Sequence, residues 1–238
     1  MILYSKGAII GFSGFIGSNL LKQYKKKIKN LDLFNTKNIN EINTKKKYDI
    51  VICSALPAAK WKANQKPDLD KKNVIFLVKN IKKLRTKKFI LISTIDIHFN
   101  HPYGMNRLFL EKFVKKKFKN YYIFRLPGVF GNGLKKNIIF DLIQNNDLHN
   151  IFTNDIFQWY DLSLLGKDIN KLIKSKKKIF ELYSEPIINS EILKFFQKRK
   201  IIKKRKIPIL YNFKPINGYF YSKKYILKRL KMYIQNPK

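Results

Sequence analysis

Residues 7–20, GAIIGFSGFIGSNL, join an apolar run to three glycines spaced three residues apart. The run ending at Ile10 predicts a short buried β-strand, and a helical pattern begins after the last glycine. A strand that turns tightly into a helix presents free backbone N–H groups and the positive end of the helix dipole. Such a turn favours a bound diphosphate, and we expect the rest of the chain to be organised around it.

The three glycines, Gly11, Gly14 and Gly17, have separate predicted roles. The first permits the turn, the second lets the backbone approach phosphates, and the third lets the helix pack closely on the strand. Phe15 and Ile16 complete the segment that we expect to bind a dinucleotide cofactor. A purely structural turn is the alternative.

The spacing G-x-x-G-x-x-G resembles that of the short-chain dehydrogenase/reductase superfamily, in particular its extended branch of NAD-dependent epimerases and dehydratases. The resemblance implies an α/β fold: a Rossmann-like, doubly wound parallel sheet with a small C-terminal substrate lobe. We expect residues 1–182 to form the NAD(P)-binding domain, with substrate-lobe insertions around 132–160. Residues 183–238 would form the lobe.

Strand and helix patterns alternate through about residue 182, which independently favours a parallel sheet with helices on both faces. Ligands of such sheets bind at the carboxyl ends of the strands. The predicted strands after the first are 28–34, 48–54, 88–94, 121–126 and 179–182. The predicted helices that matter below are 18–27, 68–84, 190–199 and 222–233, with an extended segment at 206–213.

The end of the second predicted strand should meet the adenosine ribose, and Asn35 stands there. A carboxylate at this place favours NAD, and a basic residue nearby favours NADP. The chain has Lys37 close by and Asp32 on an uncertain face. The residues leave the choice open; the resemblance leans towards NAD, with NADP not excluded.

Small or apolar residues follow two other predicted strands. Ser54, Ala55 and Leu56 come after the third, where the resemblance implies close contact between backbone and cofactor. Leu126 ends the fifth strand and is expected to flank the nicotinamide. Lys135 and Lys136 open a later predicted helix, where they could hold a diphosphate or simply be solvated.

Three residues carry the predicted chemistry. The fourth strand ends in Ser93 and Thr94, and the resemblance implies that Thr94 orients the reacting oxygen of the substrate. Tyr103 is followed four residues later by Arg107, so both lie on one helix face. A cation there favours phenolate and lowers the tyrosine pKa. We expect Tyr103 to be the acid/base and Arg107 to lower its pKa and hold the nicotinamide ribose.

The implied activity is NAD(P)-dependent epimerase, dehydratase or reductase chemistry, with hydride transfer at a carbinol centre of a nucleotide-activated sugar. The sequence departs from the family pattern twice. Arg107 replaces the usual lysine, and the segment 95–102 between Thr94 and Tyr103 is shorter than usual. These departures motivate a second hypothesis, a non-catalytic NAD(P)-binding sensor or scaffold.

The net charge of +36 raises a third hypothesis, a polyanion-binding protein. The lysines are spread over the whole chain, and arginine, whose fork suits phosphate recognition, is scarce beside lysine. No nucleic-acid-binding motif is evident. We therefore interpret the charge as compositional and do not expect a nucleic-acid partner.

The remaining expectations concern the cellular compartment, metal binding and oligomeric state of the protein. Cys53 is the single cysteine, which fits a reducing compartment, and no apolar run reaches about 18 residues. We expect a cytoplasmic protein without a membrane span. His98, His101 and His149 show no ligand pattern, so no metal is expected. The resemblance implies a homodimer through the helices at 68–84 and 103–118.

Overall fold

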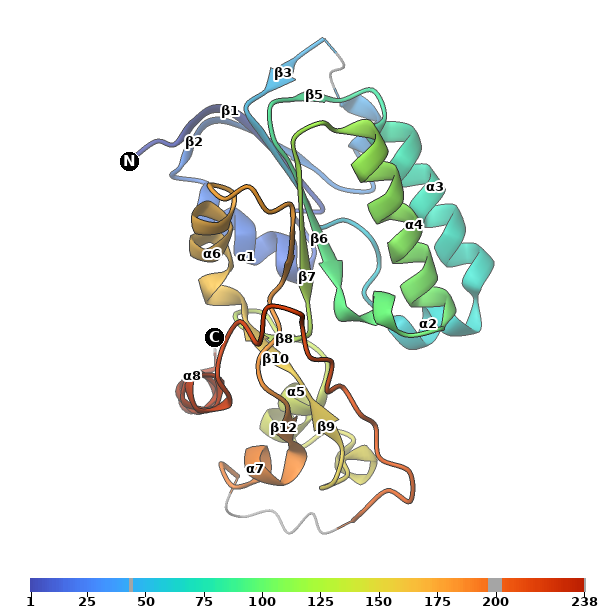
Figure 1. The fold of residues 1–238 in the computed structure, drawn as a ribbon, viewed down its shortest axis with the longest axis vertical. Coiled ribbons are helices and arrows are strands. Elements are labelled where there is room, and N and C mark those ends of the chain that lie inside the picture. Colours follow the sequence, from blue (N-terminus) through green and yellow to red (C-terminus); the bar gives the residue numbers. More distant parts are fainter. Residues whose placement is uncertain (43–44, 197–202, 238) are drawn as a thin grey trace. The chain divides into compact units, whose positions relative to one another are not determined.

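The computed structural model describes residues 1–42, 45–196 and 203–237 (Figure 1). The chain forms two compact units. The first comprises Met1–Arg125 with Leu165–Phe180, and the second comprises Leu126–Leu164 with Glu181–Lys238. The second unit therefore takes in a longer central segment than the insertions we expected around 132–160.

A six-stranded sheet forms the centre of the first unit, in the order β11-β7-β6-β4-β1-β2. Strand β1 pairs in parallel with β2 and β4, and β4 pairs in parallel with β6. The strands are β1 (Tyr4–Ile10), β2 (Ile28–Phe34), β4 (Ile50–Cys53), β6 (Phe89–Thr94), β7 (Tyr121–Leu126) and β11 (Ile179–Glu181). Short strands β3 (Lys47–Tyr48) and β5 (Arg85–Thr86) pair beside it. The predicted Rossmann-like α/β fold is confirmed, and the predicted strands differ from the observed ones by two residues at most.

The chain reverses direction across the sheet at β1. It runs from β1 outward to β2, then crosses back past β1 to β4. The carboxyl ends of β1 and β4 therefore lie side by side at a topological switch point, where open α/β sheets bind their ligands. The turn after β1 and the segment after β4 meet at this place.

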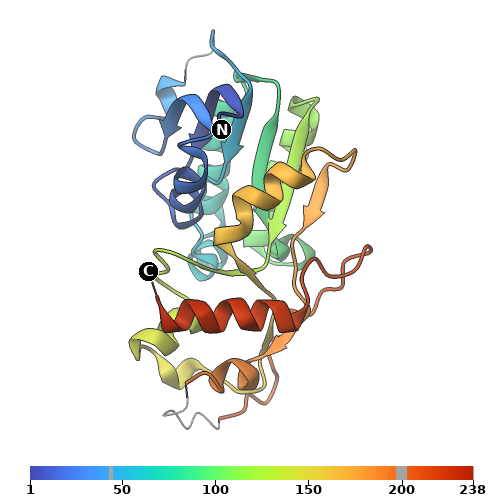
Figure 2. The same ribbon diagram turned by 90° about the vertical axis from the view of Figure 1, so that its left-hand side faces the viewer.

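Helices cover both faces of the sheet (Figure 1). One face carries α1 (Phe15–Tyr24) and α6 (Leu165–Leu172), which face the viewer in Figure 2. The other carries α3 (Pro67–Ile81), preceded by α2 (Lys60–Gln65), and α4 (Pro102–Lys117). Buried side chains of β1, β4 and β6 pack against those of α3 and α4 to form the core on that face.

The start of α1 differs from our prediction. The helix begins at Phe15 and not at residue 18, so Gly17 lies inside it. We expected the helix to begin after the last glycine because glycine is a poor helix former. Here close packing on the turn overrides that propensity.

The second unit contains two small sheets and three α-helices within its described residues. Strand β8 (Gly128–Phe130) pairs in parallel with β10 (Trp159–Asp161), and β9 (Ile156–Phe157) pairs antiparallel with β12 (Ile187–Ile188). The helices are α5 (Ile138–Gln144), α7 (Asn189–Leu193) and α8 (Lys223–Gln235). Helix α8 confirms the predicted terminal helix. The predicted helix 190–199 is cut short at Leu193, and its positions 197–199 lie outside the described residues.

Candidate functional site

The glycine turn has the conformation that its sequence predicted. Gly11 has a φ of +86°, and a Cβ there would lie 2.7 Å from the backbone nitrogen of Ala55. A Cβ on Gly17 would lie 1.9 Å from the carbonyl oxygen of Gly11. Neither position can hold a side chain, because the turn, α1 and the segment after β4 are in backbone contact.

Gly14 differs from the other two glycines. Its φ of −77° suits any residue, and a Cβ there would meet only the Gly11 carbonyl oxygen, at 3.4 Å. It is the N-cap of α1, and no side chain caps the helix. The N–H groups of the first turn of a helix have no partner within the helix. The protein's own packing therefore leaves space for a Cβ at Gly14, at the start of α1.

The segment after β4 approaches this turn closely. The N–H of Ser54 donates to the carbonyl oxygen of Ile10 over 2.9 Å, which continues the pairing of β4 with β1. The Ala55 backbone packs against Gly11. Leu56 has a φ of +126°, a conformation that non-glycine residues rarely adopt. Strained backbone of this kind concentrates at functional sites.

Asn35 follows β2 directly at the same edge. The N–H of Gly11 donates to the carbonyl oxygen of Phe34 over 2.7 Å, so Asn35 lies beside the glycine turn. The structure thus brings together the predicted cofactor residues on β1, α1, β2 and β4. Leu126 ends β7 and is buried, and its contact with a cofactor stays a prediction.

Thr94 lies at the end of β6, and Asp96 engages its hydroxyl. Thr94 Oγ1 donates to Asp96 Oδ2 over 2.9 Å and accepts from the Asp96 N–H over 3.1 Å. Asp96 also receives Lys60 Nζ at 2.8 Å and His101 Nε2 at 3.2 Å on its other oxygen. Asp96 and Lys60 were not among the predicted site residues, although an acidic residue two positions after the strand is a usable signal.

Tyr103 lies in the first turn of α4, and His101 is the N-cap of that helix. The ring nitrogen Nδ1 of His101 accepts from the Gly104 N–H over 3.1 Å, and Pro102 fills the first helical position. The Asn64 side-chain oxygen accepts from the Tyr103 N–H over 3.0 Å. His101 is thus a structural residue, as predicted, and it links the start of α4 to Asp96.

The structure does not place Arg107 as we expected. Its guanidinium binds Asp70 through two hydrogen bonds, of 2.7 and 3.1 Å, and donates a third to the carbonyl oxygen of Pro57 over 2.8 Å. Both charged side chains are buried, at 7% and 4% exposure. Arg107 lies over the ring of Tyr103, 4.2 Å from its centroid. The guanidinium therefore joins α4 to α3 and to the segment after β4.

Arg107 acts to lower the pKa of Tyr103, as expected, but the net change in this pKa is an increase. Burial raises the pKa of the phenol above its ordinary value, and this effect outweighs the opposing effect of Arg107. Asp96 and Asp70 add to the increase. Because the effect of burial exceeds that of Arg107, the phenol is protonated at neutral pH.

Arg125, in β7, forms a largely buried ion pair. It pairs with Glu111, whose side chain is fully buried, through hydrogen bonds of 3.1 and 2.7 Å. Ser93 Oγ donates to the same carboxylate over 2.7 Å. This contact fixes β6 and β7 to α4 and holds the neighbour of Thr94 in place.

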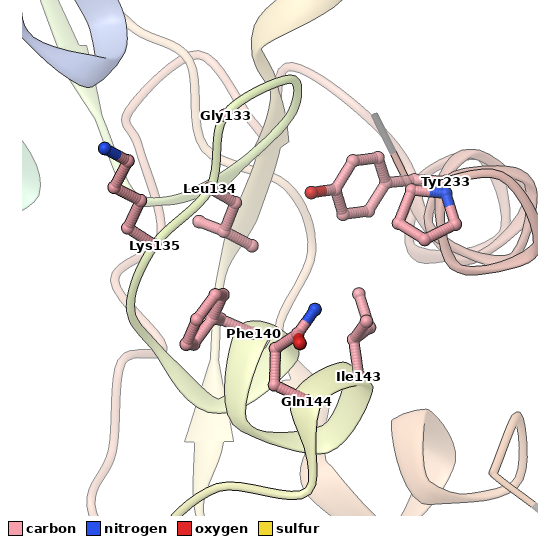
Figure 3. Close-up of a pocket in the computed structure, with 8 residues that line it drawn as sticks. Gly133, Leu134, Lys135, Phe140, Ile143, Gln144 and Tyr233 are labelled. Carbon is pink, nitrogen blue, oxygen red and sulfur yellow. The ribbon is translucent and has the colours of Figure 1, made fainter.

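The second unit contains a pocket of about 270 Å³ (Figure 3). The Tyr233 hydroxyl and the Gln144 amide point into the space, and Leu134, Phe140 and Ile143 form apolar walls. Lys135 lines the pocket, but its ammonium group points away from Tyr233 in Figure 3. The volume lies near the lower end of the range for small-molecule sites.

Within the described ranges, no group of three or more His, Cys, Asp and Glu side chains is arranged to hold a metal ion. None of the described helices combines the length and the apolar character that crossing a bilayer requires.

The first unit has a Rossmann-like α/β fold, and solved structures share the fold of this chain. The chain is similar to a UDP-N-acetylglucosamine 4-epimerase from Methanobrevibacter ruminantium M1, solved with UDP-N-acetylmuramic acid, at 16% identity and a TM-score of 0.75 over 99% of this chain and 98% of that one. It is also similar to a dTDP-4-dehydrorhamnose reductase from Bacillus anthracis in complex with NADP, at 17% identity and a TM-score of 0.71 over 96% and 99% of the two chains. A Bordetella bronchiseptica enzyme in complex with NAD is 13% identical, with a TM-score of 0.68 over 92% and 84%. No protein-family model and no curated protein sequence matches the chain.

Proposed function

We propose that the protein is an NAD(P)-dependent oxidoreductase of the epimerase, dehydratase and reductase type, acting on a nucleotide-activated sugar. The turn at Gly11, Gly14 and Gly17 is the observation that best supports a dinucleotide cofactor. Two of these glycines are required by protein packing, whereas Gly14 leaves open space at an uncapped helix start. That arrangement fits a diphosphate held by backbone N–H groups.

The proposed chemistry assigns a proton to Tyr103. A bound nicotinamide dinucleotide supplies hydride exchange with a carbinol or carbonyl carbon. Tyr103, kept protonated at neutral pH by burial, donates its proton to the substrate oxygen as a carbonyl is reduced. The Thr94 hydroxyl donates its hydrogen bond to Asp96. Its oxygen would therefore accept a hydrogen bond from the substrate hydroxyl when the substrate is in its alcohol form.

The nucleotide-sugar assignment rests on the similar solved structures and on charge. One of them is an epimerase solved with a UDP-sugar, and the net charge of +36 attracts an anionic diphosphate.

Arg107 favours a second candidate function, a non-catalytic NAD(P)-binding protein. Its guanidinium is bound to Asp70 and to Pro57, so it does not reach a ribose as a free cation would. In this alternative the dinucleotide binds without turnover, and the Tyr103 hydroxyl has no effect on function.

We also propose a homodimer and a cytoplasmic location. Helices α3 and α4 expose apolar side chains at helical spacing, Leu69 and Phe76 on one and Met105 and Phe109 on the other. Exposed apolar groups of this kind mark interaction surfaces. Cys53 is buried and unpaired, which suits a reducing compartment.

Turnover assays separate the two candidate functions. Purified protein with dinucleotide is screened against nucleotide sugars and their 4-keto derivatives, and nicotinamide absorbance or product sugars are followed. Tyr103→Phe should lower kcat at least about 100-fold, the usual contribution of a general acid. Tyr4→Phe, at the far end of β1, is the control. Dinucleotide binding with no turnover of any sugar, and no effect of Tyr103→Phe, would favour the non-catalytic alternative.

A further inference from the structure

The end of β2 is fixed against the glycine turn. Ile10 pairs with Phe34, and the Gly11 N–H donates to the Phe34 carbonyl oxygen over 2.7 Å. A diphosphate at Gly14 would therefore extend its adenosine ribose towards the next residues, Asn35–Asn38. This placement rests on the proposed dinucleotide site, and the properties of Asn35–Asn38 then decide which dinucleotide is accepted.

The turn at Asn35–Asn38 is held in one conformation by its own side chains. Asn38 Oδ1 accepts from the Asn35 N–H over 2.8 Å, and Asn38 Nδ2 donates to the Leu33 carbonyl oxygen over 3.0 Å. Asn35 Oδ1 accepts from the Lys37 N–H over 2.9 Å. One lone pair of the Asn35 oxygen is thereby engaged in the turn, and the side chain can offer its donor Nδ2 to a ligand.

The acidic residues nearest in sequence are engaged elsewhere or lie beyond the turn. Asp32 Oδ2 accepts from Lys46 Nζ and from the Tyr48 hydroxyl, each over 2.6 Å. Glu41, the next acidic residue, is exposed at the end of the 3₁₀ helix η1 (Ile39–Glu41). Lys37 is exposed within the turn itself. The turn therefore presents hydrogen-bond donors and a positive charge.

These groups suit a phosphate better than a hydroxyl. The ribose 2′-hydroxyl of NAD is recognised by a carboxylate, which accepts a hydrogen bond from it, whereas the 2′-phosphate of NADP needs donors and positive charge. We propose that the turn Asn35–Asn38 selects NADP(H) over NAD(H), with Lys37 and the Asn35 amide as ligands of the 2′-phosphate. This proposal decides between NAD and NADP, a choice that the residues alone left open.

Calorimetric titration with NADPH and NADH at one ionic strength tests the assignment. The native protein should bind NADPH at least about tenfold more tightly, the gain expected from a charge-assisted contact. Lys37→Glu should remove most of that preference by weakening NADPH alone. Asn35→Asp keeps the oxygen that the turn needs and adds a carboxylate. It should weaken NADPH and strengthen NADH.

Lys26→Glu is the control for general charge. Lys26 is exposed and lies after α1, at the opposite end of the helix from the glycine turn. Lys26→Glu changes the net charge by the same amount as Lys37→Glu, and it should leave the preference for NADPH over NADH within about twofold of the native value. Equal affinities in the native protein, tighter NADH binding, or equal effects of Lys26→Glu and Lys37→Glu would overturn the assignment. Binding of neither dinucleotide would instead remove the proposed cofactor site itself.

Discussion

Arg107 and Asp70 form a buried, two-pronged ion pair between α4 and α3, with nitrogen–oxygen distances of 2.7 and 3.1 Å. The pair lies directly beside the Tyr103 ring. A lysine at this position would have one compact ammonium group and could not make the same planar contact. The arginine is therefore a structural link. Asp70 opposes its effect on the pKa of Tyr103.

Breaking this ion pair should destabilise the fold strongly. Asp70→Ala leaves a buried guanidinium without its partner, and such changes cost about 3–5 kcal/mol. Urea denaturation monitored by circular dichroism measures the free energy of unfolding. Lys87→Ala, which removes an exposed partner of Asp49, is the control and should cost below about 1 kcal/mol. A similar small loss for Asp70→Ala would show that the buried pair does not form.

Gly17 and Gly14 should respond oppositely to alanine. A Cβ at Gly17 would overlap the Gly11 carbonyl, so Gly17→Ala should lower the melting temperature or prevent folding. Gly14→Ala should leave the melting temperature almost unchanged, because its φ is ordinary and its surroundings are open. Thermal unfolding of both variants makes the comparison, and an equal loss at the two positions contradicts the geometry of the turn.

Tyr103 should couple stability to pH in the alkaline range. Its pKa in the folded protein is raised, chiefly by burial, above the value of about 10 in the unfolded chain. Its contribution is thus fully present below pH 10 and is lost as the pH rises towards the folded pKa. The difference in unfolding free energy between the native protein and Tyr103→Phe should shrink from pH 9 to pH 11. A difference that is constant over this range would refute the raised pKa.

The exposed apolar residues of α3 and α4 should control assembly. We expect a dimer in sedimentation velocity, and Phe76→Lys with Phe109→Lys should shift it to monomer, because two charges would enter a buried apolar contact. Ile207→Lys, at an exposed apolar residue of the second unit, is the control. A native protein that sediments as a monomer at all working concentrations rules out this interface.

Patterns that act over short stretches of sequence predicted most of the fold. The strand at 28–34 and the strand at 121–126 have the predicted bounds, because apolar β-rich runs define their own ends. The roles of Gly11 and Gly17 were also predictable, since one contact decides each of them. These local signals, together with the strand order, predict the edge of the sheet at which we propose that the cofactor binds.

Contacts between distant residues were beyond prediction. Asp70 and Arg107 are 37 residues apart, and only the packing of α3 on α4 brings them together. The Tyr103 N–H donates to the side-chain oxygen of Asn64 in α2, which is 39 residues away. Burial of the Tyr103 phenol likewise depends on tertiary packing, which i, i+4 spacing cannot reveal.

The most direct test of the central claim is calorimetric titration with NAD⁺, NADH, NADP⁺ and NADPH, beside a Gly14→Asp variant. Aspartate is a favourable N-cap and Gly14 has ordinary backbone geometry, so the variant should fold as well as the native protein. Its carboxylate would occupy the proposed diphosphate position with the wrong charge. The account predicts saturable binding to the native protein and its loss in Gly14→Asp. Absence of binding to all four dinucleotides, or unchanged binding in the variant, would contradict a cofactor site at this turn.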